Sequence, residues 1–385
     1  MLGYDKKRRD NYFHFLEVKR WGKLKWIDEE ALNKLVTALI PRYEPTNLFV
    51  SIGLFILTCI IISAGVGFAA LIFIEVIDSN SGWFLSLVGA LLLLFVLQKF
   101  VINEKHQFGS GADEATLYSS LAFFHLTFIL LFENLFDSTL FISSFYFILL
   151  GVPAFIYKDR LLTAGAYLSL FALVFFLAYN IGGVMTLLIP FLLMGLSFFG
   201  FRLSEKRIDS STDQATEQCW EVINWISIAM FYLSGNYLVV MELSKELGLA
   251  DAFPLFVKII FMILTAAIPL AYIYFGLVKR NLALLNVGLI AVALSVMTVR
   301  YYHSIMPIEY ALILGGAIIL GIVWLALKFW QEDKLGVTAK ADEDLDSGLK
   351  IESLVLDQTF GKIDSTNTFS GEGGKFGGGG ASGNF

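Results

Sequence analysis

The stretch LFVSIGLFILTCIIISAGVGFAALIFIEV, residues 48–76, decides the fold of this chain. A helix of about 20 apolar residues is long enough to cross the hydrocarbon core of a bilayer. This stretch is longer than that, so it predicts a membrane span that is tilted or extends past the bilayer. Stretches of the same kind recur along the chain.

The sequence predicts an all-α bundle of ten transmembrane spans. The spans run roughly over 48–76, 83–102, 114–132, 138–157, 161–179, 182–201, 218–241, 253–277, 281–300 and 306–329. Composition agrees, because 57% of the residues are apolar and 16% are charged, against about 45–50% and about 25% in soluble domains. We therefore expect a cytoplasmic helical segment at 1–46, a transmembrane domain at 47–330, and an acidic, then Gly-rich cytoplasmic tail at 331–385 that is largely disordered.

The cationic residues test the span count independently. Residues 1–46 contain ten Lys and Arg, and the domain at 47–330 contains only thirteen. Ten of those thirteen fall on the same side as the N-terminus when the spans alternate. They are Lys99, Lys105, Lys158, Arg160, Arg202, Lys206, Arg207, Lys279, Arg280 and Lys328. Since cytoplasmic loops are enriched in Lys and Arg, this pattern predicts that both termini are cytoplasmic.

The N-terminal segment predicts a short amphipathic helical hairpin. Asp28 is a good N-cap residue, and Glu29 and Glu30 suit the positive start of a helix. The apolar residues from Leu32 onward lie on one face of that helix, and a shorter helix is expected at about 10–20. Two interpretations remain open: a basic anchor that lies on the membrane, or a docking module for a cytoplasmic protein partner.

The last residues, FGGGGASGNF (376–385), resemble the tail of bacterial TPM-domain membrane proteins, which often finish in a glycine run, Ala-Ser-Gly and an aromatic residue. Phe385 stands where those relatives usually have Trp. The resemblance implies a cytoplasmic tail after a membrane helix. It covers about 11 residues, does not extend to a TPM domain and implies no catalytic residue.

A second resemblance covers WGKLKWIDEEALNKL (21–35) and the following apolar residues NLFVSIGLF (47–55). This arrangement is similar to the bacterial multi-pass membrane proteins grouped as domain of unknown function 2157. The resemblance implies a multi-pass protein of a bacterial inner membrane with a short helical segment at its start. It implies no activity.

Polar residues within the predicted spans are candidates for a functional site, because ionisable groups are costly in lipid. Six could line a polar path between spans three, seven and nine: His125, Glu221, Asn224, Tyr232, Asn236 and Asn286. Six more could form an outer cluster: Glu133, Glu242, Lys258, Arg300, His303 and Glu309. The alternative for the first group is hydrogen bonding between helices, worth about 0.6 kcal/mol per pair.

Motifs for chemistry are weak. The sequence has no HExxH, P-loop or GxGxxG motif, and GLSFFG (195–200) is typical of helix packing more than of a serine nucleophile. The prolines of the spans do not repeat as two inverted halves would require. We expect no cofactor, metal, nucleic-acid partner or enzymatic activity. The leading interpretation is a membrane scaffold that docks partners through its two cytoplasmic ends; the alternative is a secondary transporter or proton-coupled carrier.

Overall fold

The computed structural model describes residues 3–24, 26–39, 48–73, 82–211, 213–248 and 253–302, with seven isolated positions between 310 and 324. All of them belong to the first of the chain's two units, Met1–Lys340. The elements assigned within these ranges are helical. They are α1 (Lys6–Lys23), α2 (Glu29–Ala38), α3 (Leu48–Ile72), α5 (Gly82–Val96), the π-helix η1 (Leu97–Glu104), α6 (Ala112–Leu131), the 3₁₀-helix η2 (Glu133–Leu135), α7 (Thr139–Tyr157), α8 (Arg160–Ile181), α9 (Val184–Asp209), α10 (Gln214–Gly235), α11 (Tyr237–Glu246), α12 (Leu255–Val278) and α13 (Leu282–Tyr302).

The long helices confirm the predicted class of fold. Among the described residues, eight helices are long and apolar enough to cross a membrane. They correspond to predicted spans one to six, eight and nine. The seventh predicted span, 218–241, is a pair of helices, α10 and α11, that meet at an angle of 70°. The tenth, 306–329, lies almost entirely outside the described residues, and the tail at 331–385 lies wholly outside them.

The outer surfaces of these helices are apolar. No described residue of α3 is buried, and large side chains such as Leu71 and Phe155 are 74% and 76% exposed. Soluble proteins rarely expose continuous apolar surface on this scale, whereas lipid solvates it. The chain is therefore a multi-pass membrane protein.

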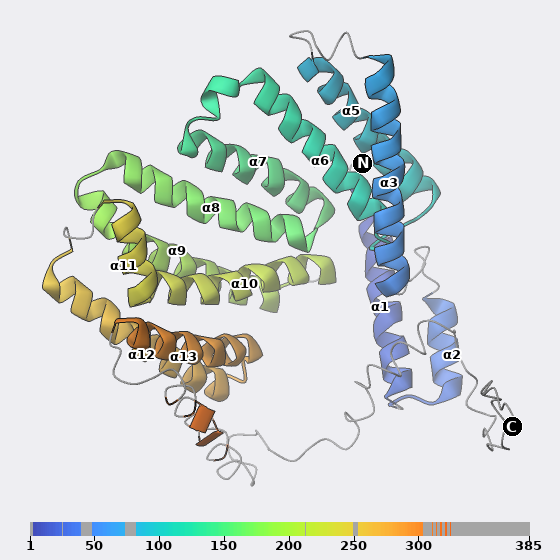
Figure 1. Cartoon of the computed structure of the whole chain (residues 1–385). Helices are drawn as coiled ribbons and strands as arrows, with labels where there is room; N and C mark the ends of the chain where they lie inside the picture. Colours follow the sequence, from blue (N-terminus) through green and yellow to red (C-terminus); the bar gives the residue numbers. More distant parts are fainter. Residues whose placement is uncertain are drawn as a thin grey trace, which may run out of the picture. The chain divides into compact units, whose positions relative to one another are not determined.

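Consecutive helices pack as antiparallel pairs, α5 with α6, α7 with α8, α9 with α10 and α12 with α13 (Figure 1). Small residues allow close approach at several of these contacts. A side-chain carbon at Gly200 of α9 would overlap the Tyr167 hydroxyl, and that hydroxyl shares a hydrogen bond of 2.8 Å with Ser227 of α10. The GLSFFG stretch thus ends in a packing glycine, as the sequence indicated.

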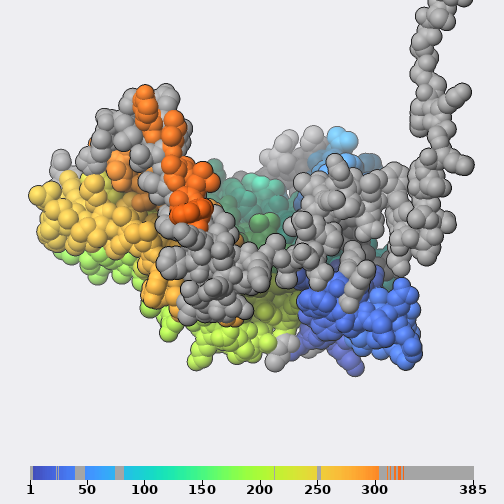
Figure 2. All heavy atoms as spheres, turned by 90° about the horizontal axis from the view of Figure 1, so that it is seen from below, coloured from blue at the N-terminus to red at the C-terminus, as the bar shows by residue number. Residues whose placement is uncertain are grey.

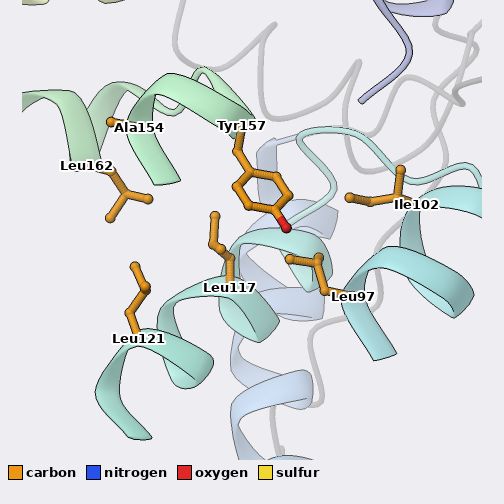
Figure 3. Close-up of a cluster of buried hydrophobic side chains, with 7 residues drawn as sticks. All are labelled: Leu97, Ile102, Leu117, Leu121, Ala154, Tyr157 and Leu162. Atoms are coloured by element: carbon orange, nitrogen blue, oxygen red, sulfur yellow. The ribbon is translucent and has the colours of Figure 1, made fainter. Parts of the chain in front are cut away.

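One buried apolar cluster joins four elements near the starts of α6 and α8 (Figure 3). Its members are Leu97, Ile102, Leu117, Leu121, Ala154, Tyr157 and Leu162. Figure 3 shows the ring of Tyr157 reaching from the end of α7 toward Leu117 and Leu97. This cluster holds the ends of η1, α6, α7 and α8 together beneath the N-terminal helix.

The break between α10 and α11 differs from the single span that the sequence predicted. Asn236 has an extended backbone, and its side-chain oxygen accepts hydrogen bonds from the amides of Leu238 and Val239, which begin α11. Its amide nitrogen donates to Tyr232 and Thr298 at 2.8 and 3.1 Å. An Asn side chain competes with the helix for backbone groups, and here that local bonding ends one helix and begins the next. Hydropathy does not register this effect.

Candidate ligand pocket beneath the N-terminal helix

Helix α1 is attached to the bundle by a buried ion pair. The guanidinium of Arg9 donates to the carboxylate of Asp213 at 2.6 Å, and the two side chains are only 5% and 11% exposed. Asp213 is also the N-cap of α10 and accepts a hydrogen bond of 2.6 Å from Thr216. A basic residue of α1 is thus bound to the N-cap of α10, just before the seventh predicted span. Figure 2 shows the blue surface of α1 beside the yellow-green of α10.

The carboxylate of Asp213 is held in its charged form. Burial alone would raise its pKa, but the hydrogen bond from Thr216 and the charge of Arg9 outweigh burial, so the pKa lies below its ordinary value. Its neighbour Asp10 shows the opposite shift, because burial and the charge of Asp213 raise the pKa of Asp10. The ion pair therefore contributes to docking of α1 at neutral pH.

The residues before α1 make a second attachment. The hydroxyl of Tyr4 donates to the carboxylate of Asp113 at 2.6 Å, and burial together with that carboxylate raises the pKa of Tyr4 well above its ordinary value. The backbone of Gly3 exchanges hydrogen bonds with the side chain of Gln98 at 2.9 and 3.3 Å. Gln98 lies in the π-helix η1, a type of helix often found at functional sites. Tyr4 thus remains a hydrogen-bond donor across the physiological pH range.

Asp113, the second residue of α6, binds the loop that precedes this helix. It is 1% exposed, and its two oxygens accept from the amides of Gly109 and Ser110, from the Ser110 hydroxyl and from Tyr4. Gly111 of the same loop has φ +87°, and a side-chain carbon there would overlap the carbonyl oxygen of Ser51 in α3. The loop therefore joins α1, α3 and α6 at one place.

A cavity of about 870 Å³ lies between α1 and the bundle. Its walls come from α1 and the residues before it, α3, the loop 105–111 and α6, the turn between α7 and α8, and the first turns of α10. Seven aromatic rings line it: Tyr4, Tyr12, Phe13, Phe55, Phe108, Tyr118 and Tyr157. Phe108 is central, with the rings of Tyr4, Tyr12 and Phe13 packed edge-on at 4.8, 5.3 and 5.7 Å between centroids. We call this cavity the α1 pocket.

The charged residues of the α1 pocket differ in their hydrogen bonding. The carboxylate of Asp159 caps α8 through the amide of Leu162 and accepts from the Tyr118 hydroxyl at 2.9 Å. Glu114, in the first turn of α6, is half-buried and makes no ion pair or hydrogen bond with the side chains that the structure describes. Arg160 is bound to Gln218 at 3.1 Å. Glu17 of α1 also lines the pocket but is exposed, so Glu114 is the half-buried carboxylate that is open to a ligand.

The structure disperses the residues of the predicted polar path. His125 of α6 lies among aromatic rings, with Tyr146 of α7 at 3.4 Å. Glu221 and Asn286 are exposed on α10 and α13. Asn224 is buried and donates to Ser204 of α9 at 3.1 Å. These contacts are between neighbouring helices, as the alternative interpretation expected.

Tyr232 and Asn236 are the two path residues that the structure joins directly. They are hydrogen-bonded to each other and, through Asn236, to Thr298 of α13. The backbone amide of Tyr237 donates to the hydroxyl of Thr265 in α12 at 2.8 Å. The Asn236 side chain and the Tyr237 amide are thus bonded to neighbouring helices, which suits irregular backbone in a membrane.

The structure also separates the residues of the predicted outer cluster. Glu242 of α11 pairs with Lys245 at 2.6 Å and accepts from Tyr302 of α13 at 2.9 Å. Glu133 is exposed on η2, and Lys258 is half-buried on α12. Arg300 has one buried guanidinium nitrogen with no partner among the described residues. His303 and Glu309 lie outside the described residues.

The site residues that sequence reasoning missed lie mostly in loops and in α1. Arg9 and Asp213 are 204 residues apart, so no local pattern connects them. A signal for the loop did exist: FGSGAD (108–113) combines two glycines with an Asp at a helix start, which is the composition of a tight turn and a cap. The described residues contain no group of three or more His, Cys, Asp or Glu able to hold a metal ion.

The fold and this pocket define a polytopic α-helical membrane protein with a cavity closed by its N-terminal helix. Comparisons of the chain with protein-family models, with curated proteins and with solved structures find no match. The function therefore rests on the geometry of the pocket.

Proposed function

We propose that this membrane protein binds a small or amphiphilic ligand in the α1 pocket without chemical change to the ligand. The observation that carries the proposal is the construction of the pocket. Its walls come from segments far apart in the sequence and are fixed by the buried contacts of Arg9 and Tyr4. Ligand sites typically occupy about 300–1,000 Å³ and combine apolar walls with a few polar groups.

Mass spectrometry of the intact full-length protein, gently exchanged into a mild detergent, tests this proposal. We expect a bound mass in about one-to-one ratio with the chain. Replacement of Gln214, an exposed residue at the pocket mouth, by Trp should remove that mass. His14→Trp on the exposed face of α1 is the matched control and should retain it. Absence of any bound mass, or its retention in Gln214→Trp, would overturn the proposal.

We further propose that the pocket faces the cytoplasm of a bacterial cell. The support is that the N-terminal residues contact η1, the loop before α6 and the start of α10. These connections belong to the side on which the cations gather, and such loops are typically cytoplasmic.

A secondary transporter is the second candidate, and the break between α10 and α11 favours it. Broken helices are common at the substrate sites of transporters. Here the same helix, α10, lines the α1 pocket with Gln214 and Gln218 and ends at Asn236. Exchange of the labelled bound molecule across proteoliposomes tests this function. Exchange that Gln214→Trp abolishes supports a carrier, and binding without exchange excludes one.

The scaffold role predicted from the sequence stays a prediction. Helix α1 is bound to the bundle through Arg9, and its exposed face is one candidate surface for a partner. Helix α2 has no buried residues and packs on α1, where Leu32 lies against Gly22. A partner for α2 stays a prediction, and the resemblances to the two bacterial families likewise stay predictions.

A further inference from the structure

We infer that the α1 pocket binds an organic ammonium group carried by an amphiphile, with Glu114 as its counter-ion and α3 as the support for its chain. This inference rests on the proposed function and names the class of ligand. Three features of the pocket carry it: its aromatic walls, the state of its charged groups, and an apolar cavity that continues from it.

The aromatic walls suit a cation. A ligand ammonium placed over an aromatic ring is attracted by the negative face of the ring, and enclosed groups of such rings are the usual site for quaternary ammonium. The seven rings of the pocket come from both sides of the cavity. Tyr4 and Tyr157 lie edge-on at 6.1 Å, and Phe55 of α3 lies 6.3 Å from Tyr118 of α6.

The charged groups give the pocket an open negative position. Asp113, Glu114 and Asp159 are the buried or half-buried carboxylates that line it, and a fourth, Glu17 of α1, is exposed. The first and third are occupied by hydrogen bonds from the protein. Glu114 has no hydrogen bond or ion pair with any residue of the described ranges. A partly buried carboxylate without a partner is costly, and a bound ammonium would supply that partner.

Lys158 and Arg160, two of the three cations of the lining, are directed to other groups, and the third, Arg20 of α1, is exposed. The ammonium of Lys158 lies 4.2 Å from the ring centroid of Phe155, which is not part of the pocket. The guanidinium of Arg160 is bound to Gln218. These contacts favour a cationic head over an anionic one, because an anion would have to draw both side chains away from their present partners.

An apolar cavity of about 550 Å³ continues from the pocket along α3. Its described lining is Phe55, Ile56, Cys59, Ile60, Ser63 and Ala64, and Phe55 lines both cavities. From residue 55 to residue 64 the helix rises roughly 13 Å at 1.5 Å per residue. A hydrocarbon chain could therefore lie along α3 while its head occupies the α1 pocket. A membrane lipid with an ammonium head and a free alkylamine share this chemistry.

The test measures ligand affinity for the full-length protein in a mild nonionic detergent. Titrations use phosphatidylethanolamine, phosphatidylglycerol with the same chains, and tetramethylammonium chloride, with thermal unfolding and intact-protein mass spectrometry as readouts. We expect phosphatidylethanolamine to bind more tightly than phosphatidylglycerol. Glu114→Gln should weaken that binding about tenfold or more, because a hydrogen bond to a charged group is lost. Glu133→Gln, an exposed carboxylate just beyond the far end of α6, is the matched control and should change nothing.

Cys59→Trp, which would fill the cavity along α3 and lies outside the α1 pocket, separates the two sources of the ammonium group. If the ligand is a lipid, this variant should weaken phosphatidylethanolamine binding and leave tetramethylammonium binding unchanged. Binding of tetramethylammonium alone, lost in Glu114→Gln, would support the ammonium site and assign it to a soluble amine. Unfolding without ligand shows whether each variant is folded.

Equal binding of the two lipids without binding of tetramethylammonium, or unchanged ligand binding in a folded Glu114→Gln, would overturn the inference. The proposed function would survive that result if the mass that Gln214→Trp displaces were present. It would fail together with the inference if the wild-type protein carried no bound mass, or if Gln214→Trp retained that mass.

Discussion

The ion pair between Arg9 and Asp213 shows how one residue can decide the position of a whole helix. Two charges lose their hydration when they are buried, and their attraction repays this cost only with good geometry. Here the carboxylate also accepts from Thr216 and from the backbone of Ala215. The pair therefore stabilises the protein only while both residues are present, because either partner alone is a buried, uncompensated charge.

The isosteric change Asp213→Asn should destabilise the protein by about 3–5 kcal/mol, because it leaves the Arg9 guanidinium buried without an anion. Unfolding of the full-length protein in detergent measures this change. Glu30→Gln, which removes the exposed pair with Lys34, is the control and should change stability by less than about 1 kcal/mol. Equal effects of the two substitutions would show that the Arg9 pair has no special weight.

Docking of α1 should also depend on pH. A carboxyl group whose pKa is lowered on folding contributes stability that is present above its unfolded pKa and is lost as pH falls through its folded pKa. For Asp213 the loss should thus occur only below the ordinary carboxyl range, about pH 4. Asp10 acts in the opposite sense, because its pKa is raised, and it is neutralised first. Hydrogen exchange of α1 amides between pH 3 and 7 checks this; release of α1 already at pH 6 would contradict it.

At the scale of elements, the loop before α6 depends on two glycines for different reasons. Gly109 has φ +60° and open space around its Cα, whereas Gly111 has φ +87° and lies against the backbone of α3. Both positions favour glycine, because L-residues are strained at positive φ. The carbonyl of Gly109 accepts a hydrogen bond from the Ser51 hydroxyl at 3.2 Å, but only at Gly111 would a side-chain carbon overlap the backbone of Ser51.

Gly109→Ala should therefore cost about 1 kcal/mol, the usual strain of a left-handed conformation. Gly111→Ala should cost more, at least about 2–3 kcal/mol, because α3 must also move away from the loop. Comparison of the two unfolding midpoints in the same detergent tests the contact between α3 and the loop. Equal midpoints would mean that α3 does not constrain Gly111.

The break at Asn236 gives a second prediction for an element. Asn236→Ala removes the cap of α11 and the bonds to Tyr232 and Thr298, so we expect a loss of about 1–3 kcal/mol. Asn286→Ala, on the exposed face of α13, should have almost no effect. Circular dichroism of the two variants during thermal unfolding distinguishes them, and a similar loss in both would remove the special role of the break.

Local sequence predicted the helices well and their contacts poorly. Hydropathy found eight of the spans because the cost of a charge in lipid depends on each segment alone. Hydropathy predicted α10 and α11 as a single span, because the mean hydropathy of a segment does not detect an Asn that caps a helix. It could not place Arg9 beside Asp213, since that contact depends on tertiary packing. The candidate path was grouped by helical spacing, whereas the structure bonds most of its residues to adjacent helices.

At the scale of the molecule, the positions of the connections predict accessibility. Lys206 is exposed in the last turn of α9, on the cationic side, and Glu133 is exposed on η2 at the opposite end of α6. In a background with Cys59 and Cys219 replaced by Ser, Glu133→Cys should react with a membrane-impermeant thiol reagent in intact cells. Lys206→Cys should react only after permeabilisation. The reverse result would place α1 and its pocket outside the cell.

The distance of 204 residues between Arg9 and Asp213 has a consequence for biosynthesis. Ribosomes add about 5–20 residues per second, so roughly 10–40 s pass between synthesis of α1 and synthesis of its partner on α10. Helix α1 thus leaves the ribosome well before its partner on α10 exists to hold it in its final position. During that interval its cationic face is available to chaperones and to anionic lipids, and the cavity above which it settles remains open.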